Sequence, residues 1–358
     1  MFRKVIDKLR GAQASEGVDD TLALARAHLE ADRPQQALEV LDALLARAGE
    51  HAEALYLRGT ARLEMQRPLQ ALPDLQRAAA IDPGDPRRHY NLARTHWDLD
   101  QVAACQRALR AALAADPGFA PAREFLGNIG LSGAHYSDAL ARIHQYLKPR
   151  TYIEIGVHKG HSLALARRET VALGIDPEPL IEVVLGPNQR VYAETSDAFF
   201  AGRDVLALLG GQRVELAFID GMHRFEFALR DFMNLEPLCA RDAVVLVHDV
   251  FPLDRETAAR ERTTTFWSGD VWRLLLLLKK HRPDLSIDTI AAPPSGLALI
   301  RNLDPDSTVI RDNLAALVEE FMALDYSALE AGKSELLNLY ANEWNEIQAL
   351  LGPLRARP

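Results

Sequence analysis

The sequence predicts two domains of different fold class, a solenoid of paired helices followed by a doubly wound α/β sheet. Two observations support this division. Small and apolar residues recur every 34 positions through the first third of the chain, and after Pro149 short runs rich in Val, Ile and Leu alternate with helical stretches. A chain of 358 residues is long enough for two domains that each bury a core.

Composition and charge narrow the classes of protein. Two cysteines, Cys105 and Cys239, form neither a disulfide framework nor a Cys-x-x-Cys pair, which fits a reducing compartment and argues against structural zinc. A formal net charge of −9 disfavours a nucleic-acid-binding surface. The N-terminus lacks the apolar segment of a secretory signal, and the apolar run Leu274–Leu278 is too short to span a bilayer. We therefore expect a cytoplasmic protein that binds neither nucleic acid nor membrane.

The internal repeat is defined by its spacing. The residues that recur at intervals of 34 are Arg33-Pro34 with Arg67-Pro68, Asp82-Pro83 with Asp116-Pro117, Ala25 with Gly59 and Ala93, Ala37 with Ala71 and Cys105, Leu41 with Leu75 and Leu109, and Tyr56 with Tyr90. Each unit contains two segments of helical period, in the second unit about 52–65 and 68–80. The prolines fall in the first turn of a helix or just after its end, where a helix tolerates them.

This pattern resembles the tetratricopeptide repeat, with another helical hairpin array as the alternative. Three units cover about Val18 to Ala120, and a partial or capping fourth unit is expected from Pro121 to about Lys148, so the predicted array spans 18–148. The resemblance implies binding of a protein partner or self-association through the repeats. No basic ladder along the repeats identifies a ligand.

The second half predicts a seven-stranded, Rossmann-like sheet over residues 149–301. The expected strands are 152–157, 171–175, 190–193, 216–219, 244–247, 285–290 and 297–300, and the expected helices are 161–168, 198–209, 225–236 and 271–281. Ligands of such a sheet bind at the carboxyl ends of its strands. Residues 302–358 predict two or three further helices, with core packing as the leading role and a dimer interface or a cover over the substrate as alternatives.

A glycine-rich turn ends the first of these strands. It reads Glu154-Ile-Gly156-Val-His-Lys-Gly160-His-Ser162, and its acid-x-Gly-x-x-x-Gly spacing differs from the fingerprint that binds a dinucleotide pyrophosphate. Asp176 ends the second strand about 20 residues on, where a carboxylate can accept both hydroxyls of a ribose. A strand-turn-helix without a ligand is the alternative.

The combination resembles the class I methyltransferases, which implies S-adenosylmethionine as the cofactor. The cofactor-binding residues that the resemblance implies are Glu154, Gly156, Gly160, Ser162, Asp176 and Ser196. Glu154 would hold the ammonium group, directly or through water, while the turn faces the amino-acid portion. Asp176 would bind the ribose, and Ser196, near the end of the third strand, would lie on the adenine side.

Two further strand ends carry acids and histidines. The fourth strand continues into Asp220-Gly-Met-His223, and the fifth ends in His248-Asp249. Because adjacent ends of parallel strands lie side by side, we expect these four side chains to converge, and an oxygen-rich group suits Mg²⁺ or another hard divalent cation. The alternatives are a helix-capping role for His223, a core hydrogen bond for His248 and a loop-starting role for Asp249.

With Gly269-Asp-Val-Trp272 and Pro293-Pro-Ser-Gly-Leu297, these motifs resemble a methyltransferase-24-like subfamily that includes bacterial O-methyltransferases and sugar-methylating relatives. The resemblance covers about Lys148 to Arg301. It implies Asp220 and Asp249 as metal ligands, with His248 as a further ligand where relatives have an acid or a histidine. It also implies His223 as the general base, with Asp220 as its partner in catalysis.

The predicted function is therefore O-methylation of a sugar or a small hydroxylated metabolite, assisted by a divalent metal. Two alternatives use the same sequence differently. One is a scaffold protein whose methyltransferase domain is inactive, and the other is a protein methyltransferase that recruits its substrate through the repeats.

Overall fold

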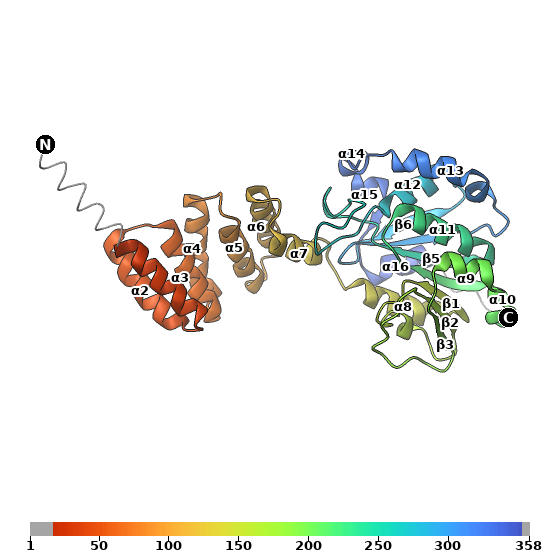
Figure 1. The fold of residues 1–358 in the computed structure, drawn as a ribbon, viewed down its shortest axis with the longest axis horizontal. Coiled ribbons are helices and arrows are strands. Elements are labelled where there is room, and N and C mark those ends of the chain that lie inside the picture. Colours follow the sequence, from red (N-terminus) through yellow and green to blue (C-terminus); the bar gives the residue numbers. More distant parts are fainter. Residues whose placement is uncertain (1–16, 353–358) are drawn as a thin grey trace, which may run out of the picture. The chain divides into compact units, whose positions relative to one another are not determined.

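The computed structural model describes residues 17–352 and divides into two compact units after Leu126 (Figure 1). The sequence predicts that the N-terminal segment is not a secretory signal. Most of that segment lies outside the described residues. Within 17–352, no helix combines the length and the apolar character needed to cross a membrane.

The first unit is an array of antiparallel helix pairs. Its helices are 17–30, α2 (Pro34–Ala48), α3 (Ala52–Glu64), α4 (Pro68–Ile81), α5 (Pro86–Asp98) and α6 (Val102–Ala115), and α7 (Ala120–Ile129) follows. The second helix of each pair begins at Pro34, Pro68 or Val102, so the 34-residue period is that of the structure. The helical repeat array predicted from the sequence is confirmed.

Small residues at the repeated positions let the paired helices approach closely. The residues of three periodic sets are all buried, and those other than Gly59 have no exposed surface. The sets are Ala25, Gly59 and Ala93; Ala37, Ala71 and Cys105; and Leu41, Leu75 and Leu109. A Cβ on Gly59 would lie 2.5 Å from Cγ of Leu75. Glycine is therefore required where α3 crosses α4.

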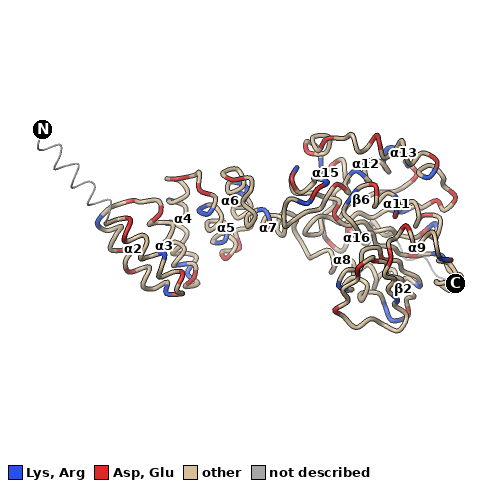
Figure 2. The backbone as a smooth tube through the Cα atoms, in the orientation of Figure 1, with Lys and Arg blue, Asp and Glu red and all other residues tan. Residues whose placement is uncertain are grey.

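Basic and acidic residues are both distributed over the repeat helices (Figure 2). The guanidinium of Arg58 lies 2.7 Å from Asp74 and 2.8 Å from Asp42, and Arg62 lies 2.6 Å from Asp74. Arg88 likewise pairs with Glu53. These three arginines therefore pair with acids of neighbouring helices.

The second unit is built on one sheet with the strand order β3-β2-β1-β4-β5-β7-β6-β8. The strands are β1 (Thr151–Ile155), β2 (Val171–Ile175), β3 (Gln189–Tyr192), β4 (Val214–Ile219), β5 (Cys239–His248), β6 (Ser286–Ile290), β7 (Leu297–Arg301) and β8 (Leu339–Tyr340). All seven predicted strands are present. β7 runs antiparallel to β5 and β6, and the two-residue β8 adds an eighth strand beside β6.

Helices cover both faces of this sheet (Figure 1). The core on one face includes residues of α9 (Ser196–Gly202), α10 (Val205–Leu208), α11 (Phe225–Leu235), α12 (Trp272–His281) and α13 (Val309–Met322). The core on the other face includes residues of α8 (Tyr136–Leu147) and α16 (Trp344–Leu351). The C-terminal segment thus packs on both faces of the sheet, and it also contains α14 (Ser327–Glu330) and α15 (Lys333–Leu336).

Helix α8 corrects two expectations. The sequence assigned 136–147 to a cap of the repeats, but Ala139, Leu140 and Ile143 are buried in the core that contains Tyr152 and Phe218 of the sheet. The helix expected at 161–168 is only a 3-10 turn, Leu163–Leu165. The sheet face that such a crossover helix would cover is already occupied by α8, which precedes β1 in the chain.

One further predicted helix is divided. The segment expected as a single helix at 198–209 forms α9 and α10, with a break at Arg203 and Asp204. The carboxylate of Asp204 accepts a hydrogen bond from the backbone N–H of Ala207, 3.0 Å away. An aspartate in extended backbone with this bond starts a new helix rather than continuing the old one.

Candidate functional site

A cavity of about 900 Å³ opens at the carboxyl ends of β1, β2, β4 and β5. Among the predicted site residues, those that line it are Gly156, Ser162, Asp176, Ser196, Asp220, His223, His248 and Asp249. The position is the one expected for a parallel α/β sheet, in which loops leave the carboxyl ends of neighbouring strands together.

The turn after β1 depends on glycine at its first position. Gly156 has φ +90°, and a Cβ there would lie 2.0 Å from the backbone oxygen of Asp220. Its N–H donates to the carbonyl of Ile175, 2.8 Å away. Glycine thus holds the end of β1 against both neighbouring strands and brings the turn next to Asp220. Gly160, also left-handed at φ +84°, closes the turn with a hydrogen bond to Val157.

Glu154 does not line the cavity. It shares one face of β1 with Tyr152, and its carboxylate accepts hydrogen bonds from the Tyr152 hydroxyl (2.7 Å) and the Ser162 hydroxyl (2.6 Å). Burial raises the pKa of Glu154 to about 8, although both hydroxyls act in the opposite direction. Ser162 lies on the cavity wall between Glu154 and the interior, so any influence of Glu154 on a ligand passes through that hydroxyl.

Asp176 and Ser196 line the same cavity. The carboxylate of Asp176 accepts backbone N–H groups of His158 (2.7 Å) and Glu178 (2.8 Å), which fix it at the end of β2. Ser196 begins α9 after β3 and donates a hydrogen bond to the buried Asp231. Burial raises the pKa of Asp231 to about 7.

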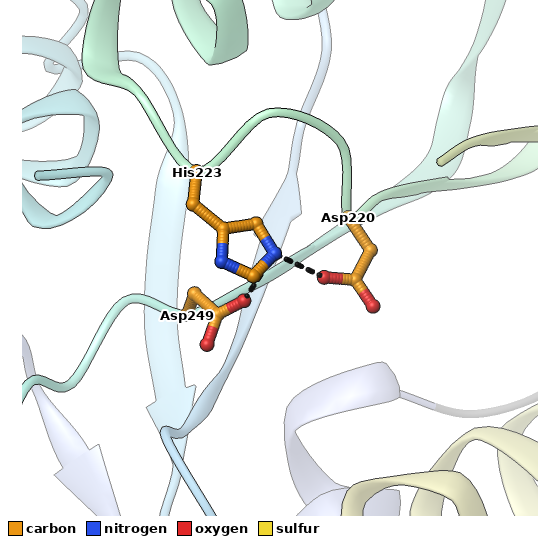
Figure 3. A group of neighbouring side chains, drawn as sticks. All are labelled: Asp220, His223 and Asp249. Carbon is orange, nitrogen blue, oxygen red and sulfur yellow. Dashed lines mark ion pairs between the residues drawn. The ribbon is translucent and has the colours of Figure 1, made fainter. Parts of the chain in front are cut away.

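Asp220, His223 and Asp249 form a compact group (Figure 3). Nε2 of His223 lies 2.9 Å from Oδ2 of Asp249 and 3.5 Å from Oδ1 of Asp220. One ligand atom of each residue lies within 4.8 Å of the others. The expected convergence of the two strand ends is present in this group.

His248 faces the same carboxylates from the end of β5. Its Nδ1 lies 3.2 Å from Oδ1 of Asp220 and 3.2 Å from Oδ2 of Asp249. Its Nε2 lies 3.3 Å from the hydroxyl of Ser295, which itself donates to Asp249. His248 therefore contacts both predicted ligands, but the group with metal-ligand spacing has His223 as its nitrogen donor.

The electrostatics of the group are strongly coupled. Burial acts to lower the pKa of His223, but the carboxylates of Asp249 and Asp220 outweigh it and hold the pKa well above its ordinary value. The same balance raises the pKa of His248 to about 10. Burial acts to raise the pKa of Asp249, but His223 and His248 hold it well below its usual range. The carboxylates favour the protonated form of the imidazoles, and the imidazoles favour the charged form of the carboxylates.

These donors fit a divalent cation. Oδ2 of Asp249 is buried and receives no hydrogen bond from the described residues, although two imidazole nitrogens approach it. The two carboxylates are the ligand type that Mg²⁺ and Mn²⁺ prefer, whereas an imidazole suits softer divalent metals, so the carboxylate oxygens would supply most of the binding of a hard cation. Asp220, His223 and Asp249 are thus the residues that could hold a metal.

Three side chains at this site stand on left-handed backbone. His158, His223 and Asp249 have φ values of 45°, 55° and 59°. Residues other than glycine adopt this region rarely and at a cost of about 1–3 kcal/mol each. Strained residues at three neighbouring strand ends are typical of a functional site.

Sequence reasoning missed the aromatic side of the cavity. Tyr136 lies on the ring of His248, with ring centroids 3.9 Å apart, and Trp267 stacks on His223 at 5.4 Å and 25°. Phe266 and Pro294 line the same side. No sequence signal marked Tyr136 or Trp267, because Tyr136 fell in the expected repeat cap and Trp267 in a loop.

Comparisons with known protein families agree with both units. Residues 22–86 and 62–129 match tetratricopeptide repeat models, and residues 153–250 match a methyltransferase domain. No curated protein matches the chain. The chain therefore combines tetratricopeptide repeats with a methyltransferase domain.

Similar solved structures correspond to about one third of the chain. MamA 41-end from Desulfovibrio magneticus RS-1 is 22% identical, with 36% of this chain and 81% of that chain covered and a TM-score of 0.30. PcrH from Pseudomonas aeruginosa is 19% identical, with 32% and 87% covered and a TM-score of 0.29. The Sgt2 TPR domain from Aspergillus fumigatus is 16% identical, with 32% and 77% covered and a TM-score of 0.31.

Proposed function

We propose that the protein is an S-adenosylmethionine-dependent O-methyltransferase, assisted by a divalent cation, that acts on a sugar or small hydroxylated metabolite. The observation that carries the proposal is the convergence of Asp220, His223 and Asp249 in the cavity that the β1 turn and Asp176 also line. A donor site and a proton-accepting, cation-binding site in one cavity would support methyl transfer to an oxygen, because both reactants would be held in position.

The donor half of the cavity has a distinct set of contacts. The turn at Gly156 brings its backbone to the cavity, where it would face the amino-acid portion of S-adenosylmethionine, and Ser162 extends the influence of Glu154 to the ammonium group of that ligand. The Asp176 carboxylate can accept the two ribose hydroxyls. Ser196 lies at the end of β3, on the side assigned to adenine.

The acceptor half is walled by rings. Tyr136 and Trp267 each lie on one of the two histidines, and Phe266 continues the wall. Aromatic faces of this kind pack against a sugar ring or another flat hydroxylated ring, while the adjacent carboxylates and imidazoles take its hydroxyl groups. This arrangement supports a small ring-shaped acceptor.

The chain supplies proton transfer and orientation. A divalent cation, when bound by Asp220 and Asp249, lowers the pKa of an acceptor hydroxyl. A cation held by the two carboxylates would offset the charge that keeps the pKa of His223 high, so the imidazole, not bound to the metal, would take the proton from that hydroxyl. His248 approaches the same oxygen of Asp249 as His223 does, and Ser295 donates to the other oxygen, so the carboxylate keeps its direction. The oxygen is then free for in-line attack on the methyl group of the donor.

The repeats have a separate role in this proposal. They present a helical surface for a protein partner or for a second copy of the chain, and the proposed reaction takes place in the cytoplasm. The residues that line the cavity all belong to the second unit. This location favours small-molecule chemistry that does not use the repeats.

The test is calorimetric titration of the full chain with S-adenosylmethionine in the presence of Mg²⁺. We expect saturable binding of about one donor per chain, and we expect Asp176→Ala to abolish it while Asp306→Ala, an exposed acid, leaves it unchanged. Screening of sugars and hydroxylated rings as methyl acceptors follows. Absence of donor binding by the folded protein would refute the proposal and favour the inactive scaffold, whose function would lie in the repeats.

A further inference from the structure

The segment between β5 and α12 contacts the loop that carries His223 at several points. We call residues 254–271 of this segment the strap. It is closed on itself, because the carbonyl of Thr257 accepts the N–H groups of Ser268 (3.1 Å) and Gly269 (3.0 Å). The indole N–H of Trp267 donates to the carbonyl of Ala259, 2.7 Å away. The strap is therefore an ordered element rather than an open loop.

The strap meets the backbone of His223 at Gly269. A Cβ on Gly269 would lie 1.8 Å from the carbonyl oxygen of His223, and Gly269 itself is left-handed, with φ +66°. Glycine is therefore required by both contact and conformation. The next N–H of the strap, that of Asp270, donates to the same carbonyl of His223 at 3.2 Å.

Asp270 also fixes the residue that follows the loop. It has no exposed surface, and its Oδ1 accepts the N–H of Phe225 at 2.7 Å. Phe225 is the first residue of α11, and Arg224 before it provides no side-chain cap. Asp270 therefore supplies from a distant part of the chain the acceptor and the negative charge that a helix N-terminus needs.

The second oxygen of Asp270 is held by arginines. Oδ2 lies 2.7 Å from Arg273 and 3.6 Å from Arg260, so the direction of the carboxylate is set. Burial raises the pKa of Asp270, and the two arginines act in the opposite direction. The two oxygens of Asp270 therefore have different roles. Oδ2 contributes an ion pair to stability, and Oδ1 holds the backbone next to His223.

We infer that Gly269 and Asp270 are positioning residues for His223. Asp270 holds the carbonyl of His223 through its own N–H and holds the N–H of Phe225 through its carboxylate, while Gly269 packs against that carbonyl. These contacts maintain the left-handed conformation from which the imidazole reaches Asp249 and Asp220. Trp267 stacks on the same imidazole from the strap. The inference rests on the proposed use of His223 in the site, and it assigns a role to the Gly269-Asp270 pair.

The experiment separates the two oxygens of Asp270. Asp270→Ala removes both, whereas Asp270→Asn retains an acceptor for Phe225 and loses the ion pair with Arg273. Asp288→Asn is the matched control, because Asp288 is a buried carboxylate paired with Arg301 at 2.6 Å and lies on β6. The ring signals of His223 are recorded by NMR with labelled histidine, assigned through His223→Gln, and Mn²⁺ affinity is measured by calorimetry without donor or acceptor. Thermal unfolding is measured for every variant.

We expect Asp270→Ala to shift the ring signals of His223 and to weaken Mn²⁺ binding ~10- to 100-fold, as is usual when a residue that orients a ligand is lost. Asp270→Asn and Asp288→Asn should both lower the unfolding temperature yet leave the His223 signals and Mn²⁺ affinity near those of the parent protein. Unchanged His223 signals in Asp270→Ala, or equal shifts in Asp270→Ala and Asp270→Asn, would overturn the inference.

A second variant covers the case in which Asp270→Ala does not fold. Asp270→Glu keeps the charge beside the arginines but moves the acceptor away from Phe225, so it should shift the His223 signals where Asp270→Asn does not. The inference would again be overturned if the ring signals of His223 shifted in neither Asp270→Glu nor Asp270→Asn, or shifted in both. A parent protein that binds no Mn²⁺ would count against the proposed metal assistance, while the ring signals would still decide the positioning role.

Discussion

Nε2 of His223 lies 2.9 Å from Oδ2 of Asp249 although the two residues belong to the ends of different strands (Figure 3). The same nitrogen lies 3.5 Å from Oδ1 of Asp220. A positive imidazole in this position balances the charge that a divalent cation would balance. Proton and cation therefore compete for one pair of carboxylates, and the chemistry of the site depends on which of them is bound.

Loss of either carboxylate should abolish metal-assisted methylation. Asp220→Ala and Asp249→Ala each remove an oxygen ligand, so we expect loss of divalent-metal-dependent activity with the fold intact. The measurement is methyl transfer at increasing Mg²⁺ concentration, with circular dichroism to check the fold. Full activity of the parent protein in the presence of a chelator would exclude a role for metal.

Replacement of His223 should separate chemistry from donor binding. Because the imidazole faces the carboxylates and not the β1 turn, His223→Ala should lower turnover by about 10²–10⁴-fold with little change in S-adenosylmethionine affinity. Steady-state kinetics and calorimetry measure the two quantities. If His223→Ala had the same rate as the parent protein at every pH, His223 would have no part in the mechanism.

The β1 turn should not tolerate a side chain at Gly156. Gly156→Ala places a Cβ against the backbone oxygen of Asp220 at φ +90°, so we expect a loss of about 1–3 kcal/mol from backbone strain alone, and weaker donor binding. Gly202→Ala is the control, because a Cβ there has nothing within 4 Å. Equal unfolding free energies for the two variants would contradict this account of the turn.

Much of this organisation could be predicted from the sequence because it depends on local pattern. The 34-residue period follows from contacts such as Gly59 with Leu75, which recur at a fixed separation. The convergence of the polar side chains that follow β4 and β5 could also be predicted, because the carboxyl ends of neighbouring parallel strands lie at one edge of a sheet. The role of α8 could not be predicted, because Leu140 and Ile143 have the same helical period whether they pack on a repeat or on a sheet. Trp267 and Asp270 act on His223 through the tertiary fold, and neither has a spacing that reveals its partner.

His144 should make the stability of the second unit fall in mild acid. Its ring is fully buried against Tyr152, and neither ring nitrogen has a hydrogen-bond partner among the described residues. Burial lowers the pKa of His144 from 6.5 to about 4. Between these two pH values the unfolded chain therefore binds a proton at His144 that the folded protein does not bind. Stability should therefore decrease from pH 6.5 to pH 4, by roughly 3 kcal/mol in total.

The check is chemical unfolding of the parent protein and of His144→Phe across this pH range. The Phe variant retains an aromatic ring beside Tyr152 and has no proton to bind, so its stability should change less between pH 6.5 and pH 4. Parallel curves for the two proteins would show that His144 stays neutral or finds a partner on protonation.

The boundary of the catalytic unit should lie before α8. A fragment of residues 127–358 retains α8 and should fold, whereas a fragment of residues 149–358 exposes the apolar surface that Leu140 and Ile143 cover. The loss is about 1.5–3 kcal/mol for each of these side chains. Unfolding curves and limited proteolysis of both fragments measure the difference. A stable 149–358 fragment would mean that α8 is dispensable.

The left-handed backbone at His158, His223 and Asp249 has a consequence for descent. Mutation to glycine at any of the three would relieve conformational cost, and at His223 or Asp249 it would also remove a side chain of the proposed site. Selection for stability and selection for chemistry therefore act in opposite directions at these positions. A lineage that stopped using the reaction would be free to accumulate glycine or asparagine there. Retention of His223 and Asp249 would distinguish relatives that use the proposed reaction from relatives that keep only the fold.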